Sequence, residues 1–272
     1  MTLPSRIRAH KFARYWYCAE ESKLRLEGVT PVYKPRPGLT AMEKGTNIDE
    51  WLRSRPRDFS EKIVTEKLEK FARENKWVNV DDFRGGSGTE TYFPRTFEFR
   101  GDFSSPAGLD IQNIEIVAHP DDFTVVWRDE DVDPYEDAPD MRRLAFTQII
   151  ENKATDKLLD DGEYPPWKLA QARFQVELYG WVLRPILKEI GELMDKRMWV
   201  KVWRFNGEPL KFYPIDYPGD DYMNAQINTI LRVWAGIEDP IIPQEWKCRV
   251  CNPAFKSVCP IALSNWTWGK RK

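Results

Sequence analysis

The sequence predicts an α/β fold in which a central mixed sheet is flanked by helices. Segments between Tyr92 and Asn152 alternate polar and apolar side chains with the period of two that is typical of strands. A long apolar pattern of helical period follows from Trp167 to Met194. The composition, with 42% hydrophobic and 31% charged residues, is that of a globular protein. No apolar run approaches the roughly 18 residues that a membrane span requires.

Helices are expected to dominate the first 80 residues. Their predicted ranges are Ser5–Leu26, Ala41–Arg55 and Ser60–Lys76. Ser60 is suited to cap the third of these helices, whose apolar stripe contains Leu68. Three glycines at positions 85, 86 and 88 then mark a turn before the strand-rich region.

Strands and two further helices are expected in the remainder. The predicted strands are Tyr92–Arg100, Ile111–Ala118, Phe123–Arg128, Leu144–Asn152, Met198–Phe205 and Leu210–Asp216, with an acidic, solvated connection at Asp129–Asp140. Asn206 and Gly207 should form the turn that pairs the last two strands, and Pro185 should kink or split the long helix. A final helix is predicted at Asp220–Gly236. We therefore expect a single domain over residues 1–272, with a core at about 90–216, N-terminal helices at 1–80 and a C-terminal tail at 217–272.

Basic side chains gather at both ends of the chain, although the net charge is −2. Arg6, Arg8, Lys11 and Arg14 precede every acidic residue, and the last three residues are also basic. Solvated surface charge is the ordinary explanation for each run, and local attraction to nucleic acid is the other. The N-terminus lacks the apolar core of a signal peptide, so a cytoplasmic location is expected.

Three short motifs follow one another in the strand-and-helix region. Asp121 follows a proline between two strands that are expected to form a hairpin. Glu151 and Lys153 end an apolar strand as an E-x-K motif. Gln175 and Tyr179 lie four residues apart on the next helix.

These residue types suit the hydrolysis of phosphodiesters. Oxygen ligands from Asp121 and Glu151 would hold one or two hard divalent cations, which activate water and offset the charge of the phosphate. Residues i and i+2 of a strand share a face, so Lys153 would lie beside Glu151 and stabilise the attacking hydroxide or the phosphate. Asn152 points to the other face, and its backbone carbonyl can still be a metal ligand.

Each motif taken alone has an ordinary explanation. An isolated E-x-K at a strand end is usually a surface salt bridge, and a lone Pro-Asp is usually a turn. Gln175 and Tyr179 share a helix face, which is either a partly buried packing surface or a means of positioning the nucleic-acid backbone or Lys153. The combination in this order favours a metal-dependent nuclease site.

The four cysteines are unevenly spaced. Cys248, Cys251 and Cys259 lie close together near the end of the chain, and Cys18 lies near its start. In an intracellular chain such a cluster favours metal binding over disulfides. Zinc and an iron–sulfur cluster both accept four thiolates, and reduced, buried cysteines are the remaining alternative.

The ordered motifs resemble those of the RecB-type branch of the PD-(D/E)xK nucleases. Asp121 is similar to the second motif of that branch, Glu151 and Lys153 to its third, and Gln175 and Tyr179 to its helical signature. With the cysteines, the resemblance narrows to the CRISPR-associated RecB-like exonucleases (the Cas-four family) and their viral relatives, and it covers nearly the whole chain. It implies a restriction-endonuclease-like core and a [4Fe–4S] cluster on the four cysteines, favoured over zinc.

Two departures from the family pattern lie in the N-terminal part. The first motif usually carries histidine where this chain has Asp49. If Asp49 is a metal ligand, the change favours magnesium over manganese; alternatively, its helix keeps its place without binding metal. After the first cysteine the family tends to have proline and a basic residue, where this chain has Ala19 and Glu20.

The resemblance implies a divalent-metal-dependent exodeoxyribonuclease that acts on single-stranded DNA ends with Mg²⁺ or Mn²⁺. Its setting would be CRISPR adaptation, alongside the adaptation proteins, or viral DNA processing in the host cytoplasm. One alternative is a catalytically decayed relative that binds DNA or protein, and another is a zinc-dependent regulatory protein. The sequence carries no readable signature of an oligomeric state.

Two further expectations concern the N-terminal segment. A cluster that joins Cys18 to Cys259 would close nearly the whole chain into a loop, so we expect the cluster to be mainly structural. Tyr15, Trp16 and Tyr17, next to the basic run, are the best candidates for stacking on unpaired bases.

Overall fold

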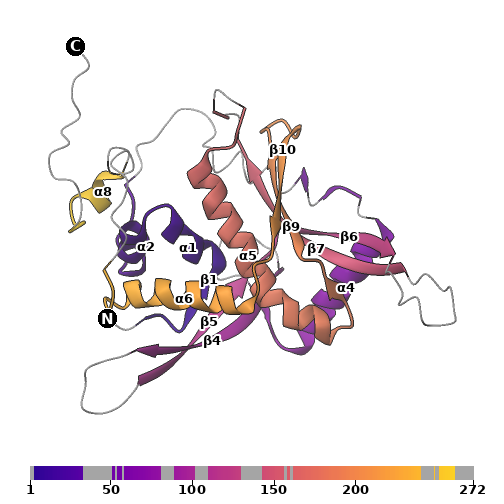
Figure 1. The fold of residues 1–272 in the computed structure, drawn as a ribbon, viewed down its shortest axis with the longest axis horizontal. Helices are drawn as coiled ribbons and strands as arrows, with labels where there is room; N and C mark the ends of the chain where they lie inside the picture. Colours follow the sequence, from indigo (N-terminus) through magenta and orange to yellow (C-terminus); the bar gives the residue numbers. More distant parts are fainter. Residues whose placement is uncertain are drawn as a thin grey trace.

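Two mixed sheets with flanking helices form the protein in the computed structural model (Figure 1). The structure describes residues 3–32, 51–52, 54–56, 58–80, 89–101, 110–129, 143–155, 158–159, 162–239, 248 and 251–260. The mixed α/β class predicted from the sequence is therefore confirmed. The predicted central sheet is divided into two among these residues.

The first sheet has the strand order β1-β5-β4. Its strands are β1 (Arg6–Arg8), β4 (Phe93–Gly101) and β5 (Asp110–Ala118). The N-terminal strand β1 runs parallel to β5, with Ile7 opposite Ile116, whereas β4 and β5 are antiparallel. Both isoleucines are buried, so the first residues of the chain are part of the core.

The second sheet has the order β10-β9-β7-β6, and a short strand, β8, also pairs with β7. Its strands are β6 (Asp122–Asp129), β7 (Arg143–Ala154), β8 (Leu193–Met194), β9 (Arg197–Trp203) and β10 (Pro209–Asp216). Strand β7 is central, since it pairs antiparallel with β6 and parallel with β9. The predicted pairing of the last two strands across Gly207 is confirmed, and this glycine has a φ of +87°. A separate two-stranded sheet joins β2 (Val78–Val80) and β3 (Thr89–Thr91).

The chain leaves the first sheet and enters the second between Ala118 and Asp122. In the described strands, β5 pairs with β1 and β4, whereas β6 pairs with β7. The predicted hairpin around Asp121 is therefore wrong. Three residues carry the chain from one sheet to the other, and the backbone bends at Asp121 where β6 begins.

The N-terminal segment is not the single helix predicted over Ser5–Leu26. It consists of β1, helix α1 (Ala9–Ala13), the 3-10 turn η1 (Arg14–Trp16) and helix α2 (Ala19–Leu26). The prediction missed β1 because a three-residue strand is too short to show a period, and its pairing is with residues more than 100 positions away.

Helix α4 (Phe59–Glu74) confirms the predicted helix at Ser60–Lys76, but its cap is Asp58. The Asp58 carboxylate accepts the Glu61 N–H at 2.8 Å, and the Glu61 carboxylate accepts the Asp58 N–H at 3.3 Å. This reciprocal capping box satisfies two backbone donors and outcompetes the cap predicted at Ser60. The last predicted helix is confirmed as α6 (Asp220–Trp234), and a four-residue helix, α8 (Pro253–Lys256), lies in the cysteine-containing tail.

Helix α5 (Pro166–Glu189) runs through the middle of the molecule. Helices α1, α2 and α6 lie on one side of it, and the sheet of β6, β7, β9 and β10 lies on the other (Figure 1). The helix is continuous through Pro185 and is not split there, and the predicted last residues, at 193–194, form β8 instead. At Gly180, a Cβ atom would lie 2.9 Å from Met198 Sδ and 3.0 Å from the Tyr217 ring, so the glycine permits close packing of α5 on β9.

The packing around α5 ties the N-terminal helices to α6. Trp234 in α6 is fully buried and stacks on Phe12 of α1 at a ring-centroid distance of 4.8 Å. Its indole N–H donates to Ser22 Oγ of α2 at 2.8 Å. These contacts hold α1 and α2 against α6.

Several predicted features lie outside the described residues. They are most of the helix at Ala41–Arg55, including Asp49, the three glycines at 85–88 and the acidic connection at 130–140. Within the described part, no helix is both long enough and apolar enough to cross a bilayer.

Candidate active site

Asp121 and Glu151 are brought together by the register of two neighbouring strands. Strands β6 and β7 are antiparallel with Asp122 opposite Ile150, so Asp121, one residue before β6, lies beside Glu151. The Asn152 N–H donates to Asp121 Oδ2 at 2.7 Å and fixes that carboxylate against the end of β7. The two carboxylates are therefore brought side by side by the register of β6 and β7.

Glu151 and Lys153 share one face of β7, as the alternation of a strand requires. The Lys153 ammonium donates to Glu151 Oε1 and, at 3.4 Å, to Gln175 Oε1. Asn152 points to the other face, where its Oδ1 accepts the Trp203 indole N–H at 2.8 Å. The expected placement of these three side chains is therefore observed.

Gln175 and Tyr179 complete the cluster from helix α5. They lie one turn apart, and the Gln175 amide donates to the Tyr179 hydroxyl at 2.6 Å. The Gln175 carbonyl oxygen faces the Lys153 ammonium, so this amide links the helix to the strand. Both side chains are buried, and they fix the position of Lys153 rather than presenting an open surface to a ligand.

The carboxyl group of Glu151 is 1% exposed and strongly perturbed. Burial, followed by the negative charge of Asp121, raises its pKa to about 8, and the charge of Lys153 only partly offsets this. Burial lowers the pKa of Lys153, but the carboxylates of Glu151 and Asp121 outweigh it and raise the pKa overall. Burial and the same two carboxylates raise the pKa of the Tyr179 hydroxyl well above its usual value, so this group stays protonated.

One oxygen of Glu151 is the feature that fits a metal ion. Lys153 and the Tyr179 hydroxyl both hydrogen-bond the Glu151 carboxyl group, but its buried Oε2 has no partner within hydrogen-bond distance among the described residues. A buried carboxylate oxygen without a donor is costly, and a hard divalent cation is the partner that such an oxygen prefers. Asp121, Glu151 and the backbone carbonyl of Asn152 are the groups that would hold it.

Two carboxylates are all that the described residues contribute to this site. Within the described part of the chain, no three His, Cys, Asp or Glu side chains are arranged so as to hold a metal ion. Asp49, the predicted additional ligand, lies outside that part.

Two further side chains lie within electrostatic range of Lys153 and were not identified from the sequence. Burial raises the pKa of Tyr164 to about 12, and the charges of Lys153 and Glu151 also act on it. His10 on α1 is close enough to Lys153 for that charge to help lower its pKa. Neither belongs to a motif, and both reach the site through folding of the chain. A basic, histidine-containing N-terminus was the only sequence signal available for His10.

The four cysteines gather beside helix α2. Cys18 caps this helix, and its Sγ accepts the Glu21 N–H at 3.5 Å. Burial, then the charges of Glu21 and of the other three cysteines, raise the pKa of Cys251 to about 12, so Cys251 lies within electrostatic range of the other three sulfurs. All four are free thiols. Among the described residues no group of three or more such side chains is arranged to hold a metal ion, so a metal centre on these cysteines stays a prediction.

The aromatic residues next to Cys18 differ in how far they are buried. Tyr15 is only 5% exposed and packs in the hydrophobic core. Trp16 packs against that core and lies 5.7 Å from the Phe174 ring of α5. Tyr15 is therefore not available to stack on a base, whereas a stacking role for the half-buried Trp16 and Tyr17 stays a prediction.

Comparisons with known proteins add little to this geometry. No family model matches the sequence. No curated protein matches it at a significant level. A solved structure described as "Crystal structure of SSO0001" aligns with 97% of this chain and 90% of that chain, at 15% sequence identity and a TM-score of 0.43.

The raised pKa of Glu151 predicts a pH-dependent loss of stability. The pKa of Glu151 is about 8 in the folded protein and has its ordinary value of 4.5 in the unfolded chain. Between pH 4.5 and pH 8 the folded protein therefore binds the Glu151 proton more tightly, and the free energy of unfolding falls as the pH rises through this range. Glu151→Gln removes this loss. We expect the free energy of unfolding of the variant, minus that of wild type, to increase by on the order of 2 kcal/mol between pH 5 and pH 8 when EDTA is present. Urea unfolding at both pH values measures it.

Glu163→Gln is the matched control. Lys211 and Tyr213 lower the pKa of the exposed Glu163, so its titration is complete below this pH range and its replacement leaves the slope unchanged. A Glu151→Gln variant whose stability follows the wild-type pH dependence would show that Glu151 is not held protonated by burial.

Proposed function

We propose that this chain is a divalent-metal-dependent nuclease that hydrolyses DNA phosphodiesters, acting as an exonuclease on single-stranded ends. The observation that carries the proposal is the buried Glu151 carboxylate, which lies beside Asp121 and has one oxygen without a donor among the described residues. The Lys153 ammonium lies at its other oxygen. Two carboxylates and a lysine on adjacent strands are the residue types that metal-assisted phosphodiester hydrolysis requires.

In the proposed mechanism, Asp121, Glu151 and the Asn152 carbonyl hold Mg²⁺ or Mn²⁺, with Asp49 as a further candidate ligand. When bound there, such an ion would supply a water of lowered pKa and a counter-charge for the phosphate. Lys153 stays protonated and donates to the non-bridging oxygens of the phosphate, where negative charge develops in the transition state. Gln175 positions Lys153, and the neutral Tyr179 hydroxyl holds Gln175 in place.

The setting of this activity is also part of the proposal. The resemblance to the CRISPR-associated RecB-like exonucleases and their viral relatives suggests trimming of spacer precursors in CRISPR adaptation, or viral DNA processing. Single-stranded DNA would be the substrate, adaptation proteins would be partners in the first case, and the location would be cytoplasmic in either.

We further propose that Cys18, Cys248, Cys251 and Cys259 hold a [4Fe–4S] cluster, with zinc as the alternative. Burial and neighbouring negative charge keep these groups as thiols, and a bound cation would favour the thiolate form of each by offsetting their mutual repulsion. The Glu21 N–H directed at Cys18 Sγ is the kind of hydrogen bond that stabilises a ligating thiolate. Such a centre would fasten the tail around α8 to the N-terminus of α2.

Replacing one of these cysteines tests the cluster. We expect anaerobically purified protein to be brown with visible absorbance that dithionite bleaches, and Cys251→Ser to lose both. Loss of the cross-link should lower the unfolding free energy by on the order of 3 kcal/mol, as for a disulfide that closes a long loop. Ser257→Ala in the same tail is the control. A colourless wild-type protein with one bound zinc ion would show that the site binds zinc and not an iron–sulfur cluster. Unchanged stability of Cys251→Ser would show that the centre has no structural role.

The nuclease proposal is tested by cleavage of end-labelled single-stranded DNA. With Mg²⁺ or Mn²⁺, we expect wild type to release nucleotides, and Lys153→Ala to be slower by at least about 100-fold, the usual effect of removing one electrostatic stabiliser. Lys188→Ala, an exposed lysine on the same molecule, should retain full activity. No cleavage by folded, metal-supplemented wild type that still shifts DNA in a gel would replace the proposal with a non-catalytic DNA-binding relative.

A further inference from the structure

The end of β7 that carries the E-x-K motif loses one of its two neighbouring strands. Strand β6 pairs with β7 as far as Ile150, whose partner is Asp122. Asn152 lies two residues further along β7, and its N–H donates to the Asp121 side chain at 2.7 Å. Beyond Ile150, the described strand that still pairs with β7 is β9. The contacts between β7 and β9 therefore decide where the groups of the site lie.

Trp203, the last residue of β9, contacts this end of β7 twice. It lies opposite Ala154 in the parallel register. Its carbonyl oxygen accepts the Thr155 N–H at 2.9 Å, just beyond the end of β7. Its indole N–H donates to Asn152 Oδ1 at 2.8 Å. One contact holds the backbone of β7, and the other holds the side chain of the residue that contacts Asp121.

The Trp203 indole is itself held in place by its surroundings. Trp203 is 6% exposed and Asn152 is 8% exposed. The rings of Trp51 and Phe212 have their centroids 6.3 and 5.3 Å from that of Trp203, and the Arg55 guanidinium lies 5.2 Å from the same centroid. Because both partners are buried, water competes little for the hydrogen bond between Trp203 and Asn152, and either group would be costly to leave unpaired.

We propose that Trp203 is a positioning residue of the candidate metal site, an inference that rests on the proposed function. Its indole N–H fixes the Asn152 side chain, and the backbone of Asn152 offers its N–H to Asp121 and its carbonyl oxygen to the cation. Asn152 also stands between Glu151 and Lys153, so a rotation of its backbone would displace both neighbouring side chains. Distances from a metal ion to its ligands vary by only about 0.2 Å, so a small displacement weakens binding.

Strand β9 contains an internal comparison at Trp199. Its indole N–H donates to Gln148 Oε1 of β7 at 2.8 Å, which is the same kind of contact four residues earlier on both strands. The Gln148 amide donates in turn to Asp195 at 2.6 Å, whereas Asn152 is connected to Asp121. An effect on metal binding that is confined to Trp203 would therefore come from the connection to Asp121 and not from the loss of an indole hydrogen bond as such.

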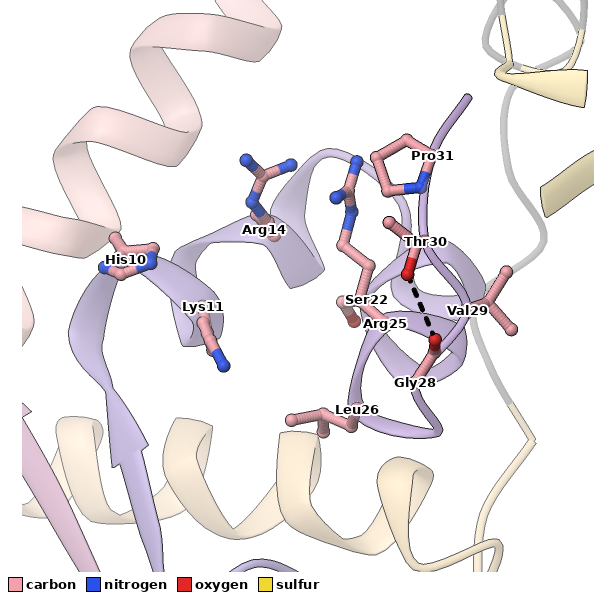
Figure 2. A pocket seen from close by; sticks show the side chains of 10 residues that line it. All are labelled: His10, Lys11, Arg14, Ser22, Arg25, Leu26, Gly28, Val29, Thr30 and Pro31. Atoms are coloured by element: carbon pink, nitrogen blue, oxygen red, sulfur yellow. Dashed lines mark hydrogen bonds between the residues drawn. The ribbon is translucent and has the colours of Figure 1, made fainter. Parts of the chain in front are cut away.

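The pocket at the N-terminal helices is separate from these contacts. Figure 2 shows this pocket of about 320 Å³, which is lined by residues of α1, η1 and α2 and of the segment up to Pro31. None of the lining residues belongs to β7 or β9. Lys11→Ala, a change in this pocket, is therefore a second control for cation binding.

Calorimetric titration of Mn²⁺ into metal-free protein at pH 7 measures the positioning role. Trp203→Phe retains an aromatic ring and removes the N–H donor. We expect its Mn²⁺ affinity to be about tenfold weaker than that of wild type, the usual effect of losing a hydrogen-bond partner behind the metal ligands. Trp199→Phe and Lys11→Ala should bind Mn²⁺ as tightly as wild type does.

A double variant separates positioning from stability. Asn152→Leu leaves the buried indole N–H without its acceptor, and Trp203→Phe leaves the amide oxygen without its donor, so each single variant should unfold at a lower urea concentration than wild type in EDTA. In the double variant neither group is left unpaired. We expect its urea midpoint to recover towards that of wild type while its Mn²⁺ affinity stays about tenfold weaker.

The outcomes separate this inference from the nuclease proposal. Weaker Mn²⁺ binding by Trp203→Phe and by the double variant, with both controls unchanged, supports the positioning role. Equal Mn²⁺ affinity of wild type and Trp203→Phe overturns it, even where wild type cleaves DNA. Equal losses in Trp203→Phe and Trp199→Phe, or an affinity that recovers together with the urea midpoint, also overturn it. Absence of saturable Mn²⁺ binding by wild type overturns the metal site itself and this inference with it.

Discussion

The candidate active site is built around one unfavourable interaction, the burial of the Glu151 carboxylate next to that of Asp121. Two carboxylates in a water-excluded site repel each other, and desolvation adds to the cost. Lys153 and the Asn152 N–H offset part of this cost, yet one oxygen of Glu151 still has no donor within the described residues. An arrangement that lowers stability is expected where function requires it, and a divalent cation is the ligand that would relieve it.

The surrounding fold serves to hold these groups in place. The change of sheets between β5 and β6 places Asp121 at the start of β6, and the register with β7 sets it beside Glu151. Helix α5, which packs closely on β9 at Gly180, carries the amide that contacts Lys153. The N-terminal helices pack on α6 through Trp234, which contacts Phe12 and Ser22, and η1 packs on α5 through Trp16 and Phe174.

Local patterns were sufficient to predict much of this arrangement. The period-two segments predicted six of the strands, and the spacing of Glu151, Lys153, Gln175 and Tyr179 correctly placed them in one cluster. What depends on distant parts of the chain was missed. Strand β1 exists because Ile7 pairs with Ile116, and the division into two sheets reflects pairing partners that no local period records. Tyr164 and His10 reach the site by tertiary packing, and the burial of Tyr15 follows from the same cause.

The most direct measurement of the central claim is a calorimetric titration of Mn²⁺ into metal-free protein at pH 7. Saturable binding is predicted for wild type and for the exposed-carboxyl variant Glu163→Gln. Asp121→Asn and Glu151→Gln should each weaken it by at least about tenfold, or 1.4 kcal/mol, because each removes a charged oxygen ligand. Equal Mn²⁺ affinity in all four proteins would contradict the claim that these two carboxylates form a metal site.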